Sequence, residues 1–260
     1  MKKSHHFSLT KLLVPGSWIL SVVFFTLSVC VVQAEELDNM DHANINIEAN
    51  EPLFVSLGSY CEPGHMVRLC GLRKAAFPFD WVVSMDLPQL CEILDQDFAR
   101  YLNTQDLVMH HEILLHPHHF IEFLHDGRWS QEAYAKNMEA FQLKYSRRIE
   151  RFRQLNHYQG KVFFLRFAYY ASKWDTQRVY NIEANEEITK DHAWRLHESL
   201  RAFFPDLDFT LIIMNVHDRQ EIEEEEPLCE SLRLFRANPH VDVPQKLANY
   251  DRFFEKLSAS

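Results

Sequence analysis

The sequence predicts an α/β fold: a single domain built on a mainly parallel or mixed sheet that helices cover on both faces. Two observations lead to this prediction. Short apolar runs of strand length alternate along the chain with longer segments whose apolar residues recur at helical spacing. The strand-length runs are apolar over most of their length, as expected of strands buried on both faces of a parallel sheet.

Four runs are predicted to be strands of this sheet: residues 53–57 (LFVSL), 119–126 (HFIEFLHD), 161–167 (KVFFLRF) and 208–216 (DFTLIIMNV). Residues 77–83 (FPFDWVV) are expected to be extended, because Pro78 lacks a backbone donor and disfavours a helix. The acidic run at 221–226 (EIEEEE) is expected to be a solvated loop over the sheet edge.

Five segments are predicted to be helices: residues 62–72, 86–94, 130–157, 186–204 and 243–257. Asp86 and Ser130 are good N-cap residue types and begin two of them. In the first helix, Val67, Leu69 and Cys70 are expected to face the core. Each helix follows or precedes a predicted strand, which completes the alternating order.

Residues 1–34 have the pattern of a secretory signal peptide. Lys2, Lys3 and Lys11 precede an uncharged apolar stretch at 18–32, and the small Ala34 suits a signal peptidase. We therefore expect export to the periplasm or the extracellular space. If the segment is not cleaved, residues 12–32 would anchor the protein in the membrane, and no other membrane contact is expected.

The polar residues 35–51 (EELDNMDHANINIEANE) show no periodicity and are predicted to be a flexible tether ahead of one domain at 52–260. Residues 1–34 carry three lysines and no acid, so their removal would change the net charge from −10 to −13. A chain this acidic is a poor candidate for binding nucleic acid or an anionic membrane.

Polar and reactive side chains lie at the ends of all four predicted strands. They are Cys61 after the first, His125 and Asp126 in the second, Arg166 in the third, and Asn215, His217 and Asp218 in or after the fourth. Ligands of parallel sheets bind beyond the carboxyl ends of the strands. We therefore expect Cys61, His125, Arg166 and His217 to gather at one edge of a single sheet.

Cys61 lies where a strand ends and a helix begins. The free N–H groups and positive dipole end there would lower the pKa of the thiol and could hold an oxyanion. Cys61 would then be a free nucleophile, with Cys70 and Cys91 as the expected disulfide pair. The alternative is a structural disulfide at Cys61, since four cysteines follow residue 34: Cys61, Cys70, Cys91 and Cys229.

The stretch SLGSYC…VRLCGLRKAAFPFDW, residues 56–81, resembles the opening signature of a largely uncharacterised family described as putative papain-like cysteine peptidases. The matching segments are 56–58 (SLG), Cys61, 67–68 (VR), 71–73 (GLR) and 78–81 (PFDW). The later segments FLHD at 123–126, RRIERF at 147–152 and VFFLR at 162–166 are also similar to the family pattern.

The resemblance implies Cys61 as the nucleophile and His125 as the base, in the Cys-before-His order of papain-like enzymes. Asp80 and Asp126 match family positions, and the third member of a triad stays open among Asp80, Asp126 and Asp218. The candidate substrate-binding residues are Arg68, Arg73, Arg166, His217 and Asp218. A Cys–His pair with an oxyanion site would act on a peptide, a protein or another acyl substrate, with no cofactor and no metal.

Two other classes of function remain open. Six histidines crowd 16 residues, at positions 110, 111, 116, 118, 119 and 125, and imidazoles at such spacing bind zinc or copper. An exported metal-binding protein is therefore an alternative. A noncatalytic domain that binds carbohydrate or protein is the other, because no motif identifies a substrate pocket.

Overall fold

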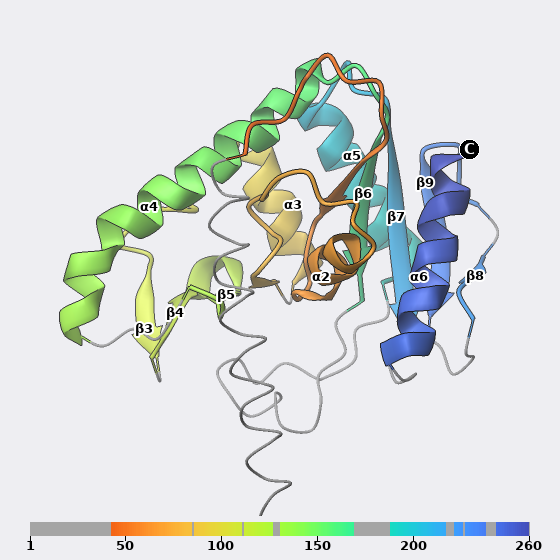
Figure 1. Cartoon of the computed structure of the whole chain (residues 1–260). Coiled ribbons are helices and arrows are strands. Elements are labelled where there is room, and N and C mark those ends of the chain that lie inside the picture. Colours follow the sequence, from red (N-terminus) through yellow and green to blue (C-terminus); the bar gives the residue numbers. More distant parts are fainter. Residues whose placement is uncertain are drawn as a thin grey trace, which may run out of the picture. The chain divides into compact units, whose positions relative to one another are not determined.

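A five-stranded sheet forms the centre of the fold in the computed structural model (Figure 1). Its strands lie in the order β1 (Leu53–Ser56), β6 (Val162–Phe167), β7 (Phe209–Val216), β9 (Leu232–Ala237) and β8 (Glu223–Glu224). The first four are parallel, and β8 pairs antiparallel with β9. The strands predicted at 53–57, 161–167 and 208–216 are confirmed. The acidic run expected as a loop contributes β8.

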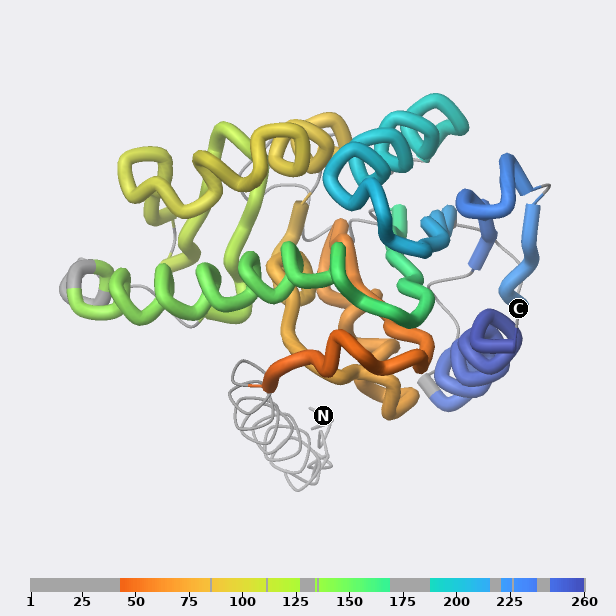
Figure 2. Tube along the Cα trace, turned by 90° about the horizontal axis from the view of Figure 1, so that it is seen from above, coloured from red at the N-terminus to blue at the C-terminus, as the bar shows by residue number. Residues whose placement is uncertain are grey.

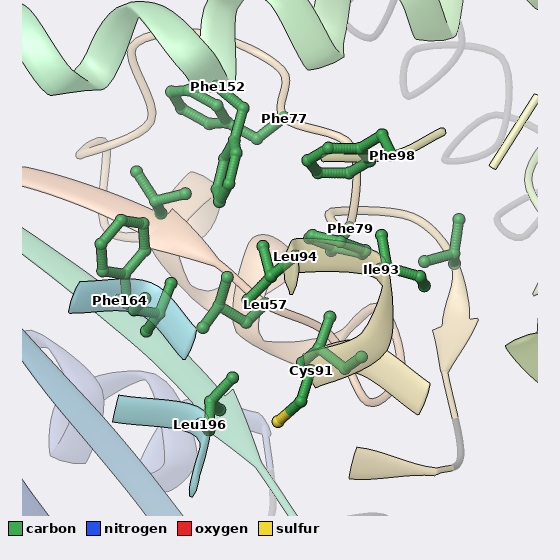
Figure 3. Close-up of a cluster of buried hydrophobic side chains, with 14 of the residues drawn as sticks. Leu57, Phe77, Phe79, Cys91, Ile93, Leu94, Phe98, Phe152, Phe164 and Leu196 are labelled. Carbon is green, nitrogen blue, oxygen red and sulfur yellow. The ribbon is translucent and has the colours of Figure 1, made fainter. Parts of the chain in front are cut away.

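Helices cover this sheet on both faces, as predicted. On one face α3 (Leu87–Asp95), α4 (Gln131–Gln154) and α5 (Lys190–Phe203) share an apolar cluster with Val55, Phe164 and Leu211 of the strands. Figure 3 shows part of it, including Phe152 of α4, Leu94 of α3 and Phe164 of β6. On the other face α2 (Glu62–Leu69) and α6 (Val243–Ser258) pack against alternate strand residues. The α/β fold class is therefore confirmed.

The structure describes residues 43–84, 86–110, 112–126, 131–168, 188–216, 221–225, 227–237 and 243–259. The predicted signal segment, Ser130, His217 and Asp218 lie outside these ranges. Among the helices that are described, none combines the length and the apolar character needed to cross a membrane.

A second, four-stranded antiparallel sheet carries the predicted strand at 119–126. Its order is β2 (Val83–Ser84), β5 (Ile121–Phe123), β4 (Ile113–His116) and β3 (Val108–His110). A 3-10 turn at η1 (Pro117–His119), followed by Phe120 with φ 50°, reverses the chain between β4 and β5. Such a short connection can join only antiparallel strands. The placement of this strand in the main sheet was therefore wrong.

Two local predictions also differ from the structure. Leu69 is 38% exposed, because the buried face of the short α2 is formed by residues such as Met66 and Val67. Residues 43–51, expected as part of a tether, pack beside the end of α4 (Figure 2). There the Ile47 carbonyl accepts from the Gln159 N–H at 2.9 Å, and the Glu51 carbonyl accepts from the Tyr158 hydroxyl at 2.8 Å.

Candidate active site

Cys61 is the N-cap residue of α2 and follows the loop that leaves β1. Its side chain is half-buried, its thiol is free, and it makes no capping hydrogen bond. The expected junction of strand, cysteine and helix is therefore present. The first N–H groups of a helix have no intrahelical acceptor, so this position offers donors to a bound oxyanion.

Arg166 fixes the loop before Cys61 to the second sheet. This side chain of β6 is 2% exposed and donates to the Leu57 carbonyl at 2.9 Å, the Ser84 hydroxyl at 2.6 Å and the Ser84 carbonyl at 2.7 Å. Gly58 passes beside it with φ 77°, and a Cβ there would lie 2.6 Å from Ser84 Oγ. Only glycine fits this close approach without strain.

The start of α2 rests on the segment that carries Asp80. A Cβ on Gly64 would lie 3.0 Å from the Asp80 carbonyl oxygen, so helix and loop touch directly. The buried Asp80 carboxylate accepts from Arg73 Nη2 and from the Phe77 N–H, each at 2.9 Å. Arg73 also lies 5.0 Å from the centre of the Trp81 ring. These contacts join the GLR segment to the PFDW segment in the folded chain.

His125 follows β5 and is solvent-exposed, with its ring edge-on to Trp81 at a centroid distance of 5.5 Å. Desolvation lowers the pKa of His125, and the charge of Asp126 opposes this shift. The ring makes no hydrogen bond to another described residue. Because Trp81 joins His125 to the Asp80 loop, and that loop touches Gly64, the second sheet brings His125 to the side of α2.

His65 is a candidate that sequence reasoning missed. It lies one helical turn after Cys61, and its backbone N–H donates to the Cys61 carbonyl at 2.9 Å. Desolvation lowers the pKa of His65, and the charges of Arg68 and His125 contribute in the same direction. The two imidazoles therefore share one electrostatic neighbourhood. The spacing of four residues between Cys61 and His65 at a helix start was the signal that could have identified it.

Neither candidate acid contacts the ring of His125. Asp126 is held by α4, where its carboxylate accepts from Lys144 and, at 2.7 Å, from the Tyr145 hydroxyl. Asp80 is occupied by Arg73 and the Phe77 N–H. Within the described residues the third member of a triad is therefore not identified, and Asp218 lies outside them.

Burial raises the pKa of the Cys61 thiol, and the charge of Glu62 raises it further, while a hydrogen bond from its own N–H opposes both effects. The expectation of a lowered pKa was therefore wrong, since desolvation outweighs the helix start. Glu62 is itself bound by Tyr60 and Lys246. Because the pKa of the thiol is raised and the pKa values of His65 and His125 are lowered, all three groups are neutral in the resting protein.

The candidate binding arginines differ in position. Arg68 is half-buried on α2, with Nη2 3.4 Å from His65 Nδ1. Arg73 and Arg166 are 8% and 2% exposed, and both bind other parts of the protein. The four cysteines of the described ranges are free, which confirms a free Cys61 and corrects the predicted Cys70–Cys91 bridge. Cys91 lies in the core cluster around α3, whereas Cys70 packs on the other face of the sheet.

Fold and site together define an α/β domain with a free cysteine at the start of a helix, a histidine one turn along that helix, and a second histidine whose charge acts on the first. The chain belongs to the family described as "Putative papain-like cysteine peptidase (DUF1796)", which matches residues 52–219. The resemblance seen in the opening signature is thus confirmed.

An uncharacterised protein of Acanthamoeba polyphaga mimivirus is 33% identical over 69 residues. That similarity covers 26% of this chain and 31% of the viral protein, so it spans less than a third of the relative. No solved structure matches this chain.

Proposed function

We propose that the protein is a cysteine-dependent hydrolase that cleaves a peptide bond or a related acyl bond. The observation that carries this proposal is the free, half-buried thiol of Cys61 at the start of α2, one helical turn before His65, whose imidazole is in turn influenced by the charge of His125. Membership of the peptidase-like family supports a peptide or protein as the substrate.

In the proposed reaction His125 accepts the thiol proton while Cys61 Sγ attacks the acyl carbon. The new C–S bond forms as the carbonyl oxygen becomes an oxyanion; the oxyanion then re-forms the carbonyl as the bond to the leaving group breaks, and the imidazolium gives its proton to that group. Water then hydrolyses the thioester, with His125 as the base. Because the resting thiol has a raised pKa and the imidazole a lowered one, proton transfer accompanies attack rather than preceding it.

The surrounding residues have positioning or binding roles in this proposal. The N–H groups of Cys61 and Glu62 would hold the oxyanion. Arg166 would fix the Cys61 loop, the Arg73–Asp80 pair would support α2, and Asp126 would anchor the segment after His125 through α4. Arg68, which is half-buried beside His65, is the arginine best placed to meet a substrate carbonyl or carboxylate. His217 and Asp218 remain proposed substrate-binding residues.

The test is turnover of a fluorogenic peptide library by the purified chain and its variants. Cys61→Ser should reduce turnover at least ~1,000-fold, and Cys70→Ser, at the other end of the same helix, should leave it unchanged. His125→Ala should cost about 100- to 10,000-fold, and His65→Ala less. If His65→Ala causes the larger loss, His65 is the base and the assignment of His125 is wrong. Turnover that survives Cys61→Ser would favour a noncatalytic role for this site.

We also propose that the protein acts outside the cytoplasm, in the periplasm or the extracellular space. This rests on the apolar segment and lysines of residues 1–34. Mass spectrometry of the N-terminus of the native protein tests it. A first residue near Glu35 supports cleavage and export, whereas an intact residue 1 in a membrane fraction supports the anchor at 12–32. An intact chain in the cytosol contradicts the proposal.

A further inference from the structure

A second group of reactive side chains lies where η1 meets α3. Glu92, His118 and His119 each offer one ligand atom, and these atoms lie within 4.8 Å of one another. His118 Nε2 is already 3.2 Å from Glu92 Oε1. Ligand atoms around tetrahedral zinc are about 3.4 Å apart, given Zn–N distances of about 2.05 Å. His118 and Glu92 are 38% and 32% exposed, so their side chains can close the remaining gap.

His119 is the buried member of this group. It is 2% exposed, and its Nδ1 has no hydrogen-bond partner among the described residues. A buried polar atom without a partner is unfavourable, and a metal ion would satisfy it.

Neighbouring side chains hold the possible ligands in place. Gln96 Nε2 donates to Glu92 Oε1 at 2.9 Å. The Gln89 amide, with its nitrogen turned toward both acceptors, donates to Glu92 Oε2 and to the His118 carbonyl at 2.9 Å each. The His116 ring stacks on His119 at 4.4 Å and accepts its backbone N–H at 3.3 Å. Such outer contacts orient the ligands of metal sites.

One contact opposes a cation. Arg100 Nη1 lies 3.4 Å from His118 Nε2. Arg100 also pairs with Asp106 at 2.8 Å and 3.1 Å, so its charge is compensated and only the contact to His118 would have to break. Two imidazoles and a carboxylate suit Zn²⁺, whereas Ca²⁺ and Mg²⁺ prefer oxygen ligands alone.

We propose that Glu92, His118 and His119 bind one Zn²⁺ ion, which ties the β4–β5 connection to α3. The site lies at the opposite end of β5 from His125. Its role is therefore to fix the second sheet, and it stands whether or not Cys61 is a nucleophile. The histidine-rich segment, which suggested a metal-binding function from the sequence, would then contribute to a structural metal site.

The experiment uses the untagged full chain, stripped with chelator and titrated with ZnCl₂ by calorimetry, with CoCl₂ absorption as a second probe. We expect one Zn²⁺ per chain, a visible tetrahedral Co²⁺ spectrum and a higher melting temperature with zinc. Glu92→Gln and His118→Ala alter part-exposed side chains and should each weaken binding at least ~10-fold. His157→Ala, which removes an exposed histidine of η2 (Leu155–His157), should bind as the parent chain does.

Three outcomes would overturn the proposal. The first is no stoichiometric zinc in the parent chain. The second is equal affinity in Glu92→Gln, His118→Ala and the parent. The third is MgCl₂ raising the melting temperature as much as ZnCl₂, which would indicate a nonspecific effect of divalent ions.

Discussion

The nucleophile and the histidine proposed to serve it come from two sheets that are built differently. β1, which precedes Cys61, is an edge strand of the parallel sheet, buried on both faces and paired along its length with β6. β5, which precedes His125, is three residues long, and the residue after His125 is held by side chains of α4. Arg166 therefore holds the loop between β1 and Cys61, whereas Lys144 and Tyr145 of α4 hold the residue after His125. The site depends on the residues that join the sheets.

Among the described residues that join the sheets, Arg166 makes the most hydrogen bonds, and its substitution should lower the stability most. Arg166→Met removes three charge-assisted hydrogen bonds and leaves the carbonyls of Leu57 and Ser84 buried without a donor. We expect the free energy of unfolding to fall by about 3–5 kcal/mol, measured by urea denaturation.

Arg153→Met is the matched control, because Arg153 pairs with Asp97 on the surface, where its side chain is 41% exposed. We expect a loss below about 1 kcal/mol for this change. Equal losses for the two arginines would mean that Arg166 does not join the sheets.

The Arg73–Asp80 pair supports α2 from the loop before β2 and should have the next largest effect. Asp80→Asn leaves the Arg73 guanidinium buried without its carboxylate, so we expect a loss of about 3 kcal/mol. The double variant Arg73→Met with Asp80→Asn also removes the unpaired guanidinium. Its loss of unfolding free energy should therefore be smaller than the sum of the losses in the two single variants. Thermal and urea unfolding of all three variants measure this coupling. Strict additivity would contradict a direct pair.

The smallest expected effect concerns the thiol itself. The Glu62 charge raises the pKa of Cys61, so Glu62→Gln should lower that pKa and move the pH profile of iodoacetamide labelling of Cys61 to lower pH. Glu255→Gln, an exposed change on α6, is the control and should not move it. An unchanged or higher midpoint in Glu62→Gln would contradict this effect of the Glu62 charge on Cys61.

The parallel sheet was predictable from sequence because its long apolar strands and helices have clear periodicities. β9 was not predicted, because the half-buried Arg233 and Arg236 interrupt its apolar pattern. The second sheet was missed because its strands have two to four residues, too short for alternation to show. Cys61 could be identified from its junction and motif. The partners of Asp80 and Asp126 could not, since Arg73, Lys144 and Tyr145 reach them only in the folded chain.

The most direct test of the proposed site is to locate the acyl group after a brief reaction with p-nitrophenyl acetate, by intact mass and peptide mapping. The account predicts a single acetyl group on Cys61, formed about 100-fold or more slowly in His125→Ala, and unaffected in Cys70→Ser. Acetylation spread over Cys61, Cys70 and Cys229 at rates that do not change in His125→Ala would contradict it. The two sheets would then bring no Cys–His pair together.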